Sequence, residues 1–134
     1  MRVLRALILG GAAILVAAGS AIAHHSFAAE FDRDKPFKMT GKVTKVEWMN
    51  PHTFFYIDVV DEETKKVTNW GMEMGSPNIL MRNGWRRDTM KIGDVVVVEG
   101  SLAKDGTPTG NARTVTLAST GKRLFAGSSG GDTP

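Results

Sequence analysis

The chain of 134 residues contains no cysteine. A disulfide therefore cannot stabilise the fold, and no thiolate is available as a nucleophile, as a metal ligand or as the attachment point of a lipoprotein anchor. The sequence also lacks a nucleophile elbow and a phosphate-binding glycine loop. Because the motifs of these enzyme classes are missing, we expect a protein that is not an enzyme.

Long apolar runs are absent beyond the beginning of the chain. Two arginines precede an apolar segment from Ala6 to Ala18, and Ala21-Ile22-Ala23 provides the small residues that a signal peptidase requires. This segment is shorter than the about 20 apolar residues of a membrane-spanning helix. The pattern predicts a signal peptide over residues 1–23, cleaved before His24. We therefore expect a periplasmic or secreted protein with no membrane span after cleavage.

An excess of charge of one sign is missing as well. Removing residues 1–23, which include two arginines, lowers the formal net charge from +3 to +1. Proteins that bind nucleic acid usually cluster positive charge on one face. Here the lysines and arginines are scattered among acids. We therefore expect no nucleic acid partner, and the oligomeric state stays open.

The remaining sequence consists of short segments with strand chemistry, separated by turn residues. Five strands are predicted, over Met39–Met49, Thr53–Val60, Val67–Met74, Val95–Glu99 and Ala112–Ala118. Val43 and Val46 are three residues apart, which breaks strict alternation and predicts a bulge or a sharp bend in the first strand. The charged segment between the second and third strands is expected to be a solvated turn.

One short helix is predicted between the third and fourth strands. Ser76 can cap it, Pro77 suits its first position and Gly84 can end it. The order β-β-β-α-β-β is that of the OB-fold. We therefore predict an all-β protein, an OB-fold-like five-stranded barrel over residues 39–126. A lead-in over 24–38 precedes this domain, and a flexible tail over 127–134 follows it.

Short motifs run through nearly the whole chain that follows the signal. They are His24–Asp32, Val46-Glu47-Trp48 with Asn50-Pro51-His52, Asn69-Trp70 with Glu73, Gly75-Ser76-Pro77-Asn78, Gly84-Trp85, and Gly110-Asn111-Ala112-Arg113. In these motifs the chain resembles a bacterial family of small exported proteins that is classed as a domain of unknown function. The resemblance implies an exported, OB-like domain and supplies no catalytic residues.

The third predicted strand carries a second, looser similarity. Its segment from Asn69 to Met74 is similar to the Trp/Met strand of the periplasmic copper/silver efflux chaperones, in which the tryptophan lies one residue further from the first methionine. Those small OB barrels hold Cu(I) with two methionines and one histidine. The similarity implies Met72 and Met74 as candidate soft ligands. The alternative interpretation is that both belong to the core with Trp70, because methionine commonly fills gaps there.

All three histidines lie at informative places. Cleavage after residue 23 would make His24 the first residue, and its amine and its ring Nδ1 could then chelate one metal ion. His25 offers another ring, and His52 lies between the first two strands, where OB-folds place a ligand-contacting loop. The arrangement is similar to the histidine brace of several exported copper proteins. We predict a metal site of His24, His25 and His52, with copper as the cofactor because it binds nitrogen donors most strongly.

Several functions fit these observations. The first is a copper-binding accessory protein that carries or buffers the metal ion. The second is a non-metal module that contacts a periplasmic protein, a peptide or a glycan through the loop around Asn50-Pro51-His52. A third is a structural role, without a ligand, in a larger envelope complex. For His52 alone, the simplest alternative is a turn residue whose ring bonds to the backbone.

Overall fold

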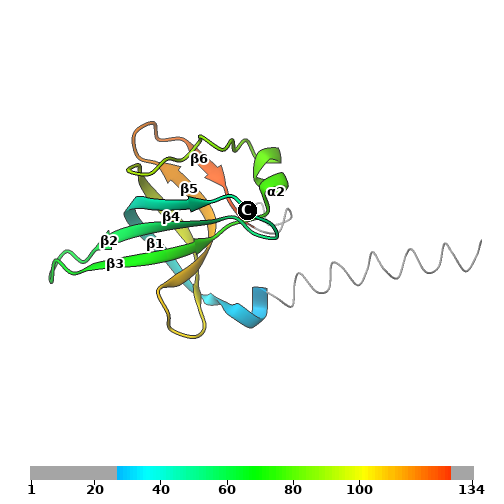
Figure 1. Ribbon diagram of the computed structural model, residues 1–134. Helices are drawn as coiled ribbons and strands as arrows, with labels where there is room; N and C mark the ends of the chain where they lie inside the picture. Colours follow the sequence, from blue (N-terminus) through cyan, green and yellow to red (C-terminus); the bar gives the residue numbers. More distant parts are fainter. Residues whose placement is uncertain (1–26, 128–134) are drawn as a thin grey trace, which may run out of the picture. The chain divides into compact units, whose positions relative to one another are not determined.

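The computed structural model describes residues 27–127. Residues 27–30 form a single helical turn, and Phe31 begins a separate compact unit that contains all the strands. Its elements are β1 (Phe31–Glu47), β2 (Phe54–Val60), β3 (Val67–Glu73), α2 (Pro77–Arg82), β4 (Val95–Ala103), β5 (Thr109–Leu117) and β6 (Arg123–Phe125), as Figure 1 shows. The predicted all-β class and the order of the first five strands and the helix are confirmed.

The sheet closes on itself in the manner of an OB-fold. The first part of β1 pairs with β4, and its last part pairs with β2. β2 pairs with β3 and β4 pairs with β5, and all these pairs are antiparallel. β5 then returns to β3 in parallel, with Glu73 opposite Asn111. The ring therefore runs β1-β2-β3-β5-β4, and β6 lies beside β5.

β1 serves both halves of the ring because it bends. The register between β1 and β2 shifts between Val43 and Lys45, so the predicted bulge is confirmed. Gly41 lies where β1 passes from β4 to β2, and a Cβ added there would come within 2.8 Å of the carbonyl oxygen of Asp58. A side chain at this position would separate β1 from β2.

The inner face of the ring forms the hydrophobic core. Alternate residues of β2 and β3 point inward, and Phe55, Ile57 and Met72 are fully buried. Trp85 is also fully buried, and its indole N–H donates a 2.8 Å hydrogen bond to the carbonyl oxygen of Phe125. α2 contributes Leu80 to this core. Leu80 thus packs α2 against the ring, and the hydrogen bond of Trp85 connects the segment after α2 to β6.

α2 begins where the sequence predicted it. The side chain of Ser76 accepts a 3.4 Å hydrogen bond from the backbone N–H of Ile79, and Pro77 occupies the first turn. Ser76 thereby satisfies one of the N–H groups that a helix leaves unpaired at its start. The helix ends at Arg82, and Gly84 follows with a φ of 91°. The left-handed conformation at this position favours glycine.

Several strand ends differ from the prediction. β1 begins at Phe31 rather than at Met39, so the second half of the expected lead-in is part of the sheet, while β4 continues to Ala103 and β5 begins at Thr109. Residues 32–35 are charged, and the sheet pairing with β4 continues from Pro36, so this part of β1 leaves little hydrophobic signal in the sequence. The strand β6 was missed because its three residues are too few to show a period. The signal peptide and residues 128–134 of the predicted tail lie outside the described residues. Within residues 27–127, no helix is long and apolar enough to span a membrane.

We expect Gly100→Ala to destabilise the protein, because a Cβ at this β4 position would collide with the backbone carbonyl oxygen of Asn111 in β5. The free energy of unfolding should fall by at least about 2 kcal/mol. Urea unfolding followed by tryptophan fluorescence measures this change. Ser101→Ala is the matched control, since the neighbouring side chain is half-buried and should cost less than about 1 kcal/mol. Equal losses in the two variants would contradict the proposed contact.

Candidate functional site

His52 lies in the loop between β1 and β2, directly after the cis peptide bond that joins Asn50 to Pro51. Its side chain is 32% exposed, and its Nδ1 lies 3.0 Å from Oε1 of Glu73. The carboxylate of Glu73 is much less accessible, with 9% of the side chain exposed. The half-buried imidazole of His52 is thus held by the nearly buried carboxylate of Glu73.

Glu73 owes its position to the register of three strands. It is the last residue of β3, and it lies opposite Phe54 of β2 and opposite Asn111 of β5. Since successive side chains of a strand point to opposite faces, Glu73 lies on the outer face while Met72 and Met74 lie on the inner one. Three of the sequence motifs, at residues 52, 73 and 111, therefore come together at one end of the sheet.

The contact with Glu73 determines which nitrogen of His52 is available. An ionised carboxylate can only accept a hydrogen bond, so Nδ1 must be the nitrogen that carries the ring proton. The lone pair of the neutral ring is then on Nε2. Among the residues that the structure describes, Nε2 has no hydrogen-bond partner. Histidines that bind metals usually have this arrangement, in which the second ring nitrogen donates to a carboxylate or a carbonyl. The geometry presents His52 as a ligand through Nε2.

Buried polar atoms without partners lie close to His52 in the sequence or next to Glu73 in the sheet. Within residues 27–127 they are Nε1 of Trp48, Oγ1 of Thr53 and Nδ2 of Asn111. Thr53 directly follows His52, and Asn111 lies beside Glu73 across the β3–β5 pair. A buried donor without an acceptor costs about 1–3 kcal/mol, and native proteins usually supply such groups with water or a ligand. These unpaired groups make this end of the sheet a candidate contact for water or for a polar ligand.

A charged network lies on the outer face next to Glu73. The side chain of Glu47 forms an ion pair with Lys45 and accepts a 3.3 Å hydrogen bond from the hydroxyl of Tyr56. The hydrogen bond from Lys45 is the main reason that the pKa of Glu47 is lowered, and the same bond raises the pKa of Lys45. Since the folded pKa of Glu47 is depressed, its stabilising contribution is present at neutral pH and is lost as the pH falls through that value.

The predicted site residues have different outcomes. His24 and His25 lie outside the described residues, so their role stays a prediction. Met72 and Met74 are fully buried in the core, which agrees with the alternative interpretation of these methionines; their role as ligands also stays a prediction. In residues 27–127, no group of three or more histidine, aspartate or glutamate side chains is arranged to hold a metal ion.

Sequence reasoning missed Glu73 and Asn111 as site residues. Both belong to motifs that carried the family resemblance, and this was the available signal. From the sequence alone, an acidic residue at the end of a strand is expected to be exposed, so its burial could not be predicted. Only the pairing of β3 with both β2 and β5 shows that it faces His52 and Asn111.

The sequence model of a family of unknown function, DUF6152, matches residues 12–113. The chain belongs to this family. The match covers every motif from His24 to Arg113, so the resemblance noted in the sequence is confirmed. The comparison with curated proteins finds no match. The looser similarity to the copper/silver efflux chaperones stays a prediction.

We expect Glu73→Gln to change the tautomer of His52, because an amide no longer offers the charged acceptor that holds the proton on Nδ1. The nitrogen-15 chemical shifts of the ring, measured by NMR at alkaline pH, should show mainly Nδ1–H in the original protein and a mixture of tautomers in the variant. Glu47→Gln is the matched control, since Glu47 bonds to Lys45 and Tyr56 instead. Identical shifts in the original protein and in Glu73→Gln would show that the carboxylate does not orient the ring.

Proposed function

We propose that this member of the DUF6152 family binds one copper ion outside the cytoplasm and carries or buffers it. Nε2 of His52 is one ligand, and the amine and Nδ1 of His24 are the other two. The observation that carries the proposal is the 3.0 Å contact between His52 and the buried carboxylate of Glu73. This contact fixes the ring and leaves Nε2 as a nitrogen donor, which is the ligand type that copper prefers.

The donor set also suits the chemistry of copper. An α-amine has an ordinary pKa of about 7.7–8.0, so a metal ion can displace its proton near neutral pH. Three nitrogen donors would suit Cu(II), which binds such ligands strongly. The bound ion would supply redox chemistry or would simply be held for transfer. Arginine, lysine and cysteine take no part in this ligand set.

The proposal predicts that the protein purified from cells that express the full chain takes up about one copper ion per chain. His52→Ala should weaken the affinity at least about 100-fold, because the chelate at the amino end loses its third ligand. Native mass spectrometry reports both the first residue and the bound ion, and competition with a chromophoric chelator gives the affinity. Met49→Ala is the control in the same loop, since this exposed side chain is not part of the proposed ligand set.

Two results would end the proposal. The first is an amino terminus other than His24, because a preceding residue removes the chelating amine. The second is an affinity of the original protein weaker than micromolar. Equal affinities of the original protein and His52→Ala would remove His52 from the site and leave a chelate at the amino end alone.

A second candidate is a binding module that uses the same loop without a metal. The supporting observation is Met49, whose side chain is 47% exposed beside the exposed Asn50-Pro51 dipeptide. Methionine is enriched in the contact surfaces between proteins. Met49→Asp should then abolish a reproducible periplasmic interaction while copper uptake stays unchanged. Capture experiments with the original protein and this variant compare the two.

A further inference from the structure

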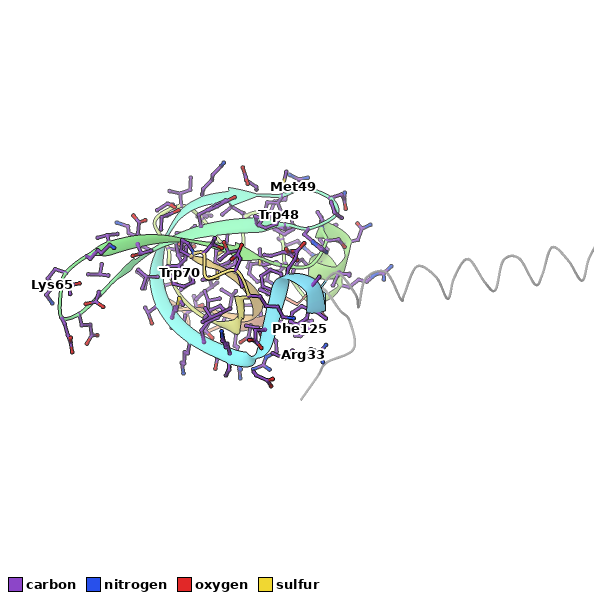
Figure 2. The ribbon with its side chains drawn as sticks, turned by 90° about the horizontal axis from the view of Figure 1, so that it is seen from below. Arg33, Trp48, Met49, Lys65, Trp70 and Phe125 are labelled. Carbon is purple, nitrogen blue, oxygen red and sulfur yellow. The ribbon has the colours of Figure 1, made fainter. Side chains whose placement is uncertain are left out.

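The hairpin of β2 and β3 extends beyond the rest of the sheet. β1 pairs with β2 only as far as Asp58, and β5 pairs with β3 only from Gly71 onward. Residues 59–69 therefore form a two-stranded arm, which Figure 1 shows projecting from the ring and at whose tip Figure 2 labels Lys65. Within residues 27–127, this arm has no strand neighbour on either edge.

The hydrogen bonds at the two ends of the arm show which backbone groups face outward. Asp61 donates its N–H to the carbonyl of Lys66, so the groups of Lys66 point across the hairpin. Gly71 donates its N–H to the carbonyl of Pro108, away from β2. Because these directions alternate along a strand, Val67 and Asn69 point their N–H and C=O groups away from β2. The edge of the arm thus offers two donors and two acceptors to another strand.

The arm combines a charged tip with an apolar pair of side chains at its open edge. Natural proteins usually protect an edge strand with a charged side chain, a proline or a bulge. Here Val67 lies at the open edge with 54% of its surface exposed, and its cross-strand partner Val60 is 53% exposed. An exposed pair of β-branched side chains favours further strand pairing, since these residues pack well on a pleated surface.

We propose that the arm pairs antiparallel with the same arm of a second copy of this chain. With the two-fold axis at Thr68, Val67 of each copy lies opposite Asn69 of the other. The two outward residues of each copy then exchange four backbone hydrogen bonds. Val60 and Val67 of both copies lie on one face of the joined arms, so the apolar pairs become a single cluster.

Charge complementarity supports a second copy as the occupant. The loop that begins at Lys104 lies beside the end of the open edge, because Pro108 bonds to Gly71. In the proposed pairing, Lys65 and Lys66 of one copy pass this loop of the other, which carries Asp105. Hydrogen bonds from Thr107 lower the pKa of Asp105, so this exposed group is a carboxylate at neutral pH. The lysines of each copy therefore meet an acid of the other.

The paired surface is small, so the association should be transient and concentration-dependent. Sedimentation equilibrium of the protein purified from cells should show a monomer–dimer equilibrium, with a metal chelator present to exclude bridging by histidines. Hydrogen exchange should show that the amides of Val67 and Asn69 become protected as the concentration rises. This result does not depend on the proposed copper site.

Val67→Pro tests the edge directly. The substitution removes an outward N–H without breaking the β2–β3 ladder, and proline is tolerated at such edge positions. The dimer loses two hydrogen bonds, so its dissociation constant should rise at least about tenfold. Ile92→Ala is the control, since this exposed side chain lies outside the arm, and it should leave the dissociation constant and the protection of Asn69 unchanged.

Three outcomes would overturn the proposal. One is a monomer at all concentrations, with the amides of Val67 and Asn69 unprotected. Another is a dimer that Val67→Pro leaves unchanged, which would place the interface elsewhere. The third is a protein that stays monomeric but protects these amides on adding an extended peptide, which would make a peptide the occupant of the edge.

Discussion

The parallel pairing of β3 with β5 is the constraint on which the rest of the structure depends. It involves only Gly71 to Glu73 and Thr109 to Asn111, yet it closes the ring. Gly110 lies within this pair, and a Cβ at this position would lie 2.5 Å from the ring of Phe37 of β1. Without the pairing, this edge of β3 would be open and Glu73 would not be buried beside Asn111.

The same pairing divides β3 into two parts with different properties. Where β5 covers it, the strand is buried on its inner face by the core and carries the polar cluster of His52, Glu73 and Asn111. Where β5 is absent, the strand has an open edge, and its side chains at Val67 and Asn69 are exposed. The proposed copper site and the proposed pairing surface therefore lie at opposite ends of one strand. A substitution in one of them should leave the other intact.

The accuracy of the sequence prediction follows the strength of the hydrophobic pattern. Phe55, Ile57, Met72 and Met74 lie at alternate positions with strand-forming neighbours, so β2 and β3 could be predicted. The start of β1 could not, because residues 32–35 are charged and show no such pattern. The strand β6 could not either, because its three residues are too few to show a period. His52 was recognised from its residue type, but its carboxylate partner was not.

The sequence by itself determined the all-β class, the order of the strands, the cap of α2 and the family, because each is set by neighbouring residues or by a linear motif. Only the tertiary structure decided the register of the strands in the ring, the burial of Glu73 and the free nitrogen of His52. These depend on the register between strands that are far apart in the chain, and a shift of one residue would turn Glu73 to the opposite face. Local patterns do not specify such a register, whereas the packed sheet allows only one.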